Sequence, residues 1–405
     1  MKPVQIKYQP ERSVTFLGSP SIVRLPDGAL LSTHDHFGPG CPRNHEDEES
    51  LTSVHRSEDD GATWSNITHV MNAYWSSLFV HGGSVYLLGT SQQYGSIVIR
   101  RSDDGGFRWT HPKDADSGLL FPGGPFKVAP NYHCAPVAVL EHEGRIYKAF
   151  EDCDPCVWGT GFQACVISAP VDADLLDAAN WRMSNKLPFT PSWTPAAWGP
   201  VTQPGWREGN VVAAPDGQLW DVLTFEARPL AQDTAAMVRI DGEGERISFD
   251  PGANPDPAEP AGPGGFVAFP GAKAKFTLRR DPVTGTYLTL ANAVTDPEWL
   301  IATWQATQPP GEGLNKHPRQ RNEVWLCASD DLVRWRTVKR LMVDESGLRP
   351  EDSLRLTGFQ YVDWRFDGDD LIYVVRTAYR GARNFHDSNR ILFNRERAFR
   401  RLIAT

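Results

Sequence analysis

The sequence lacks any long apolar run. No stretch approaches the roughly 20 apolar residues that a membrane-spanning helix needs, so we expect no membrane association. The opening segment, MKPVQIKYQPERS, contains no apolar core of the kind a signal peptide requires. We therefore expect a cytoplasmic protein, or a secreted one whose signal peptide is absent from this sequence.

An excess of positive charge is also missing. The 405 residues include 41 lysines and arginines against 50 aspartates and glutamates, for a net charge of -9. Proteins that bind nucleic acids neutralise phosphates with basic surfaces. The charge balance therefore argues against a nucleic-acid partner.

Cysteine is scarce, with six irregularly spaced residues. Cys153 and Cys156 have the CxxC spacing, but no second CxxC accompanies it, which argues against a structural zinc site. We expect free buried thiols, while a disulfide among Cys153, Cys156 and Cys165 stays open. No cofactor is expected; calcium at the acidic segment His45–Ser50 is possible but not indicated.

Glycine, proline and apolar residues are plentiful. The chain has 35 Gly and 32 Pro, yet 40% of its residues are hydrophobic, which separates it from disordered chains. Many short strands joined by tight turns fit this composition. The sequence therefore predicts an all-β protein and excludes a helical bundle.

A hairpin pattern recurs along the chain: an alternating apolar run, a turn with Gly, and a second alternating run. Each copy is followed by a second hairpin, so the repeat predicts four strands per unit. Six such units predict a single-domain β-propeller over residues 1–405 with six four-stranded blades, seven being possible. The six first hairpins are Ser19–Ser32, Ser77–Thr90, Ala135–Phe150, Asn210–Leu223, Lys275–Leu290 and Gln360–Val375.

Three segments do not follow the hairpin pattern. Asp172–Asn180 is expected to be a short surface helix. Pro251–Pro270 and Thr295–Arg321 lack strand alternation and are expected to be long loops, which in a compact domain are often functional.

The second hairpins carry a sharper motif, S-x-D-x-G-x-x-W. It occurs at Ser57–Trp64 and Ser102–Trp109, and a degenerate copy lies at Ser329–Trp335. In such a turn the Ser and Asp side chains bond the backbone, Gly adopts an unusual φ and Trp packs between sheets. The motif resembles the Asp-box of sialidase-like propellers, and the resemblance covers nearly the whole chain.

The resemblance implies a site at the propeller axis. Sialidases use a Glu from an Asn-Glu-Pro motif to activate a Tyr nucleophile, and the matching positions here are Glu208 and Tyr361. The first arginine of the sialidase carboxylate-binding triad matches Gly18. Because bidentate arginine is the strongest reader of a carboxylate, this departure argues against a true sialidase.

Histidines stand near the same axial ends. In Thr33–Pro39, His34 and His36 are expected to share one strand face, with Asp35 turned the other way. A metal bound by the two histidines is the less favoured interpretation. Tyr132 and His133 open the third hairpin at its axial end. Together with the histidines of Thr33–Pro39, they resemble the site residues of propeller polysaccharide lyases and related rhamnoglucuronan-cleaving enzymes, which use His with Tyr and Arg.

We therefore predict an enzyme that cleaves a terminal glycosidic bond next to a uronic acid, such as rhamnosyl-glucuronate, by hydrolysis or β-elimination. Its partner is an oligo- or polysaccharide, and its oligomeric state is not predicted. The alternatives are an exo-sialidase and a non-catalytic propeller that binds a glycan or a protein. The predicted catalytic residues are His34, His133, Glu208 and Tyr361, and the predicted substrate-binding residues are His36, Tyr132, Lys148, Arg207, Lys275, Arg376 and His386.

Tryptophans in or near loops admit two interpretations. Such side chains stack on sugar rings, but they also fill cores and interfaces. The sequence leaves this open for Trp75, Trp158, Trp193, Trp198, Trp206 and Trp304.

Overall fold

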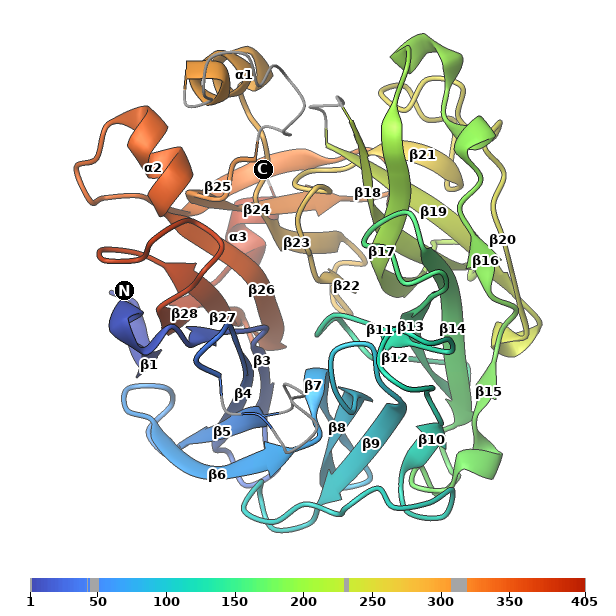
Figure 1. Ribbon diagram of the computed structural model, residues 1–405, viewed down its shortest axis with the longest axis vertical. Coiled ribbons are helices and arrows are strands. Elements are labelled where there is room, and N and C mark those ends of the chain that lie inside the picture. The colour runs from blue at the N-terminus through green and yellow to red at the C-terminus, as the bar shows by residue number, and fades with distance from the viewer. Residues whose placement is uncertain (1, 42, 44–50, 229–232, 307–318, 405) are drawn as a thin grey trace.

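The computed structural model describes residues 2–41, 43, 51–228, 233–306 and 319–404. Within these residues the strands form six antiparallel sheets, which Figure 1 shows arranged in a ring. The predicted all-β propeller with six blades is confirmed. Each blade has four strand positions, and short extra strands occupy the edges of the first, third and fourth blades.

The first three blades follow one another along the chain. Blade 1 contains β2 (Phe16–Leu17), β3 (Ser21–Arg24), β4 (Leu30–Phe37), β5 (Leu51–Ser57) and β6 (Ser65–Met71). Blade 2 contains β7 (Tyr74–His81), β8 (Ser84–Thr90), β9 (Ile97–Ser102) and β10 (Leu119–Phe121). Blade 3 contains β11 (Tyr132–His133), β12 (Leu140–His142), β13 (Arg145–Cys153), β14 (Phe162–Pro170), β15 (Arg182–Met183) and β16 (Leu187–Pro188).

The remaining blades complete the ring. Blade 4 contains β17 (Thr202–Ala213), β18 (Leu219–Arg228), β19 (Thr234–Asp241), β20 (Arg246–Ser248) and β21 (Gly265–Ala268). Blade 5 contains β22 (Leu278–Arg280), β23 (Tyr287–Ala291), β24 (Glu323–Ser329) and β25 (Arg336–Val343). Blade 6 contains β26 (Gly358–Asp367), β27 (Asp370–Ala378), β28 (Arg390–Glu396) and the N-terminal β1 (Val4–Tyr8).

The N-terminal strand belongs to the last blade. β1 pairs antiparallel with β28, from Val4 opposite Phe393 to Tyr8 opposite Arg390. The hairpin pattern gave no sign of this strand, because β1 has no hairpin partner nearby in sequence. Its pairing covers the outer edge of blade 6, and an open edge would otherwise expose unpaired backbone groups.

The helices are short and lie outside the blades. The predicted helix Asp172–Asn180 is wrong except for one 3₁₀ turn, which Asp177 caps by accepting from the Ala179 N–H at 2.8 Å. The predicted loop Pro251–Pro270 contains β21, and the predicted loop Thr295–Arg321 contains a helix, while residues 307–318 lie outside the described part. The helices are α1 (Pro297–Ala306), α2 (Pro350–Leu356) and α3 (Arg400–Ile403), with 3₁₀ turns η1 (Glu11–Ser13), η2 (Ala178–Asn180), η3 (Pro191–Trp193), η4 (Ala196–Trp198) and η5 (Gly242–Gly244).

None of the helices found among these described residues has the length and apolarity to cross a bilayer.

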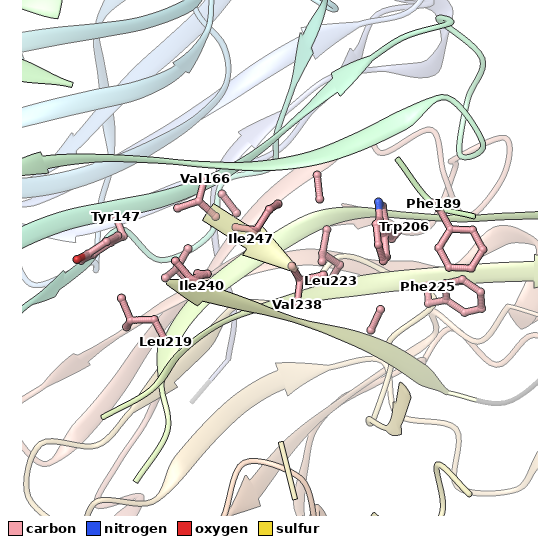
Figure 2. Packing of buried hydrophobic residues seen from close by; sticks show 14 of the residues in the cluster. Tyr147, Val166, Phe189, Trp206, Leu219, Leu223, Phe225, Val238, Ile240 and Ile247 are labelled. Carbon is pink, nitrogen blue, oxygen red and sulfur yellow. The ribbon is translucent and has the colours of Figure 1, made fainter. Parts of the chain in front are cut away.

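Apolar side chains pack between neighbouring blades. Figure 2 shows the cluster between blades 3 and 4, which contains Tyr147 and Val166 from blade 3 and Trp206 and Phe225 from blade 4. Trp206 is fully buried. Trp193 and Trp198 pack against the same cluster, so these three tryptophans belong to the interface between blades rather than to a sugar site.

The first Asp-box turn forms as its residues predict. The Gly61 N–H donates to Ser57 Oγ at 2.9 Å, and the Thr63 N–H donates to Asp59 Oδ1 at 2.8 Å. The ring of Trp64 lies 5.4 Å from Phe393 of blade 6. The turn therefore docks blade 1 onto blade 6, and in the degenerate copy Leu332, with φ of 75°, stands where the other copies have Gly.

Gly61 and Gly28 provide a matched pair for testing this docking. Both have φ near +90°, but a Cβ on Gly61 would lie 2.1 Å from the Phe393 ring, whereas a Cβ on Gly28 would meet nothing within 4 Å. We expect Gly28→Ala to lower the free energy of unfolding by about 1 kcal/mol through backbone strain alone. Gly61→Ala should lose roughly a further 1–3 kcal/mol through overpacking. Urea unfolding measures both, and equal losses would contradict docking at this turn.

Candidate active site

Three innermost strands share one backbone irregularity. The strand register shifts in β7, β17 and β26, and in each shift a non-glycine residue adopts a left-handed φ: 48° at Trp75, 57° at Glu208 and 52° at Tyr361. Such bulges re-aim side chains, and strained backbone of this kind clusters at functional sites. The three side chains therefore occupy equivalent places in blades 2, 4 and 6.

Glu208 and Tyr361 are brought together by two of these bulges. The Tyr361 hydroxyl donates to Glu208 Oε1 at 2.8 Å, although the residues are 153 positions apart. Burial and the neighbouring Glu208 carboxylate raise the pKa of Tyr361 to about 12, against the opposing effect of three arginines. The phenol is therefore protonated at neutral pH and has a base in contact.

The three arginines surround this pair. The guanidinium carbon of Arg376 lies 4.8 Å from the centroid of the Tyr361 ring, and that of Arg321 lies 6.0 Å from it. Arg207 Nε lies 4.0 Å from Glu208 Oε2. All three arginines are buried, so the charges act with little screening.

Protein partners satisfy only part of this charge. Arg376 donates to the His386 carbonyl at 2.8 Å, and Arg321 donates to the side-chain oxygen of Gln360. Within the described residues, Nε of Arg321, Nε of Arg376 and Oε2 of Glu208 have no hydrogen-bond partner. Buried polar groups rarely stay unbonded, so these atoms can receive a polar ligand.

A second carboxylate joins the cluster. Glu226 bonds Arg207 Nη2 at 2.9 Å and Arg319 Nη2 at 3.0 Å. Its charge offsets part of the positive charge of the arginines.

The structure does not bring the two predicted histidines of β4 to this pair. The rings of His34 and His36 do share a face, 4.8 Å apart, but His34 Nε2 bonds His55 Nε2 at 3.1 Å and His36 Nε2 bonds Ser53 Oγ at 2.8 Å. On that face, His36 lines a cavity beside Lys7, together with Ser53 and His55 of β5. Because side chains alternate along a strand, neither histidine joins Glu208 and Tyr361.

Asp35, on the opposite face of β4, is the residue turned toward the site. Its Oδ2 accepts from the Trp75 N–H at 3.0 Å, and Arg376 lies close enough to stabilise its charge. Burial is the larger influence and raises the pKa of Asp35 to about 7. Asp35 can therefore hold a proton near neutral pH, which the sequence reasoning missed.

His133 lies at the axial end of blade 3 and is held by Glu151. The His133 Nδ1 and Glu151 Oε2 atoms are 2.6 Å apart, and Glu151 Oε1 accepts from the Gly209 N–H at 3.2 Å. The His133 ring packs 4.3 Å from Trp75 and 4.6 Å from Phe162. Glu151 therefore links His133 to the residue that follows Glu208.

The structure gives three predicted substrate-binding residues internal roles instead. Lys148 is fully buried and donates to the Ala135 carbonyl at 2.9 Å, while Tyr132 packs in the core between blades 2 and 3. Lys275 donates to the Val362 carbonyl at 2.8 Å, next to the bulge at Tyr361. Their assignment to substrate is not supported, because each side chain is committed to the protein interior.

His386 lies beside Arg376. Its Nε2 is 3.2 Å from Arg376 Nη2, and its Nδ1 is 2.9 Å from Asp387 Oδ1. Of the predicted substrate-binding residues, Arg207, Arg376 and His386 therefore lie in the cluster around Tyr361.

The described residues hold no group of three metal-ligating side chains suited to a metal ion, and the acidic segment His45–Ser50 lies outside them. All six cysteines are free, so the disulfide left open among Cys153, Cys156 and Cys165 is not formed.

Sequence reasoning missed Arg319 and Arg321 as well. Both directly precede the hairpin that begins at Glu323. Residues that lie just before a strand, at the strand end that faces the propeller axis, converge on the site. The position of Arg319 and Arg321 before the strand that begins at Glu323 is therefore the signal that could have identified them.

The bulge geometry predicts a change in the ionisation of Tyr361. In Glu208→Gln the negative neighbour that raises the pKa is lost while Arg321 and Arg376 remain, so we expect the pKa of Tyr361 to fall from about 12. Ultraviolet difference titration of the phenolate, with Glu208→Gln/Tyr361→Phe as the blank, measures it. An unchanged pKa would show that the contact does not form in solution.

Neither a protein-family model nor a curated protein sequence matches this chain. Solved structures do resemble it in fold. An α-L-arabinanase from Penicillium chrysogenum, complexed with arabinobiose, has a TM-score of 0.56 at 16% identity, with 98% of each chain covered. An α-L-arabinofuranosidase from Fusarium graminearum gives 0.57 at 12% identity, covering 100% of this chain and 99% of that one. A Trypanosoma rangeli sialidase in complex with sialic acid gives 0.57 at 13% identity, covering 100% of this chain and 59% of that one. At such identities the likeness establishes a shared propeller fold.

Proposed function

We propose that this protein is a glycoside hydrolase that cleaves the glycosidic bond of an acidic sugar at the propeller axis. One observation carries the proposal: the Tyr361 hydroxyl donates to the Glu208 carboxylate at 2.8 Å while two buried guanidinium groups flank the phenol ring. The fold shared with arabinanase, arabinofuranosidase and sialidase structures is consistent with it.

Tyr361 is the proposed nucleophile. A phenol with a pKa near 12 attacks poorly on its own, so its proton must pass to Glu208 as the bond to the anomeric carbon forms. An aryl oxide suits an anomeric centre that carries or adjoins a carboxylate, because a charged carboxylate nucleophile would be repelled there. Water then cleaves the glycosyl–tyrosine bond and gives its proton to the carboxylate of the acid that protonated the leaving oxygen, while Glu208 returns its proton to the phenolate oxygen.

Arg321 and Arg376 are the proposed carboxylate ligands. Each has a buried Nε without a hydrogen-bond partner among the described residues, and arginine binds carboxylates in a fixed planar geometry. This pair supplies a grip on a carboxylate even though Gly18 stands where sialidases have the first arginine of their triad. The exo-sialidase alternative is therefore stronger than the sequence alone made it.

Asp35 is the proposed proton donor for the leaving oxygen. A general acid works best when its pKa lies near the working pH, and burial raises the pKa of Asp35 to about 7.

β-Elimination at a uronate, such as the glucuronate of a rhamnosyl-glucuronate chain, is the second candidate. The buried guanidinium groups favour it, since elimination also requires neutralisation of the carboxylate. In that reaction Glu208 would take the C5 proton and Tyr361 would protonate the leaving oxygen. His34, predicted to be catalytic, bonds His55 instead and has no role in this scheme.

Substitution at the pair tests the proposal. We expect Tyr361→Phe and Glu208→Gln each to lower the rate by roughly 10²–10⁴-fold, because each removes one partner of the proton transfer. Sialyl-lactose and rhamnose-capped glucuronate oligosaccharides are the test substrates. A released saturated sugar marks hydrolysis, and ultraviolet absorbance of an unsaturated uronate marks elimination.

Tyr8→Phe is the matched control, since Tyr8 also lies under an arginine, 4.9 Å from Arg390, but on the outer strand of blade 6. Full activity in Tyr361→Phe would refute the nucleophile. Binding of these glycans without any cleavage would instead indicate the non-catalytic, glycan-binding propeller.

The pH dependence tests Asp35. An acid must be protonated to act, so the rate should fall as pH rises through about 7. Asp35→Asn should be slow and lack this decline.

The pKa of Asp35 in the folded protein is raised above its unfolded value, so the stability contribution of Asp35 is present below about pH 4 and is lost as pH rises through about 7. Thermal unfolding should therefore show Asp35→Asn gaining on the wild type as pH rises from about 4 to about 7, with no further change above that. A difference that stays constant across this window would contradict the shift.

A further inference from the structure

Trp158 differs from the other tryptophans in its exposure. All 14 tryptophans lie in the described residues, and Trp158 is the one with an exposed side chain, at 48%. An exposed indole forfeits a large hydrophobic contribution, and exposed apolar surface often marks a binding site.

Trp158 lies next to the catalytic pair. Its ring is 5.3 Å from the guanidinium carbon of Arg207, whose Nε is 4.0 Å from Glu208 Oε2. One side chain therefore separates the exposed indole from Glu208. Arg207 Nη1 is buried and has no hydrogen-bond partner among the described residues, so it can donate to a ligand hydroxyl.

Aromatic rings continue from Trp158 toward the axis. His133 lies edge-on to Trp158 at 5.6 Å, and Trp75 lies edge-on to His133 at 4.3 Å. Trp75 occupies the bulge of β7, the place that Glu208 and Tyr361 take in their own blades. The three rings form a wall, here called the aromatic wall, that runs from the surface to the axial site.

The loop that carries Trp158 is held tightly. The Gly161 N–H donates to the Val157 carbonyl at 2.9 Å, and a Cβ on Gly161 would lie 1.8 Å from the Pro155 carbonyl oxygen. Gly205 of β17 approaches the same loop, since its Cβ would lie 2.3 Å from the Gly159 carbonyl oxygen. A surface presented by a fixed loop loses little conformational entropy when it binds.

We propose that Trp158, with the aromatic wall behind it, is a stacking subsite for the neutral sugar bonded to the acidic sugar of the substrate. The subsite rests on the proposed function, because that function places the acidic sugar against Arg321 and Arg376. The C–H face of a pyranose packs on an indole, and Arg207 Nη1 bonds one of its hydroxyls. Arg207 is already paired with Glu226, which favours a neutral sugar over a second acidic one.

Measuring binding in a slow variant tests this subsite independently of cleavage. The parent protein is Tyr361→Phe, in which cleavage is expected to be slow enough to leave the glycan intact during a titration. The ligands are sialyl-lactose, a rhamnose-capped glucuronate oligosaccharide, and free sialic and glucuronic acids. Adding Trp158→Ala should weaken binding of whichever oligosaccharide binds the parent more tightly by about 10-fold, equal to about 1.4 kcal/mol. Binding of the free acids should not change, and Trp158→Phe should recover most of the loss.

Phe107→Ala is the matched control. Phe107 is also an exposed aromatic residue, at 49%, and Arg56 lies 5.6 Å from its ring, but it sits in the second Asp-box turn away from the site. Titration calorimetry gives the affinities, and unchanged unfolding midpoints confirm that the variants fold. We expect Phe107→Ala to bind like the parent.

Four results would decide the matter. Equal oligosaccharide affinity in the parent and in the Trp158→Ala variant overturns the subsite, and so does an equal loss for the free acids. Binding that depends on Trp158, without cleavage by the wild type, supports the subsite and refutes the proposed function. No binding of either oligosaccharide overturns both.

Discussion

The left-handed backbone at three equivalent bulges is the constraint on which the site depends. A regular innermost strand would alternate its side chains between the two adjoining blades and send none along the axis. One extra residue at Trp75, Glu208 and Tyr361 breaks that alternation. The strain is tolerated because neighbouring groups fix each bulge: Asp35 accepts from the Trp75 N–H, Glu151 from the Gly209 N–H, and Lys275 bonds the Val362 carbonyl.

Charge at the axis is arranged in two layers. Glu151, Lys148 and Lys275 are buried and bonded to backbone groups or to His133, so they keep the strands in place. Asp35 holds the bulge at Trp75 in addition to its proposed proton transfer. Arg321, Arg376 and Glu208 keep atoms that no described residue bonds. Burying charge in this way destabilises a fold unless partners are present. Under the proposed function, recognition of the substrate carboxylate accounts for such atoms.

The fold could be predicted because its hairpins repeat along the sequence. The site could be predicted only in part, because it depends on the direction in which each side chain points. Hairpins and Asp-boxes are local, so six blades could be counted from turns such as those at Gly28 and Gly61. Glu208 and Tyr361 were found through their motifs. Residue type favours His34 and His36 over Asp35 as groups that transfer protons. Strand alternation, however, decides which side chains of β4 face the axis, and it selects Asp35. Arg321 escaped because its role depends on a contact with a ring 40 positions later in the chain, which no local pattern encodes. β1 escaped for the same reason.

The pairing of β1 with β28 has a consequence for how the site comes into being. Blade 6 carries Tyr361 and Arg376, and its outer strand is made of residues from the opposite end of the chain, with Val4 opposite Phe393. Contacts this distant in sequence form late, because a long loop must close first. During synthesis Glu208 and its blade can emerge and pack early, while the blade that supplies the phenol waits for the last strands. The ring thus acquires its proposed chemistry only at closure, so a partly folded chain is also an inactive one.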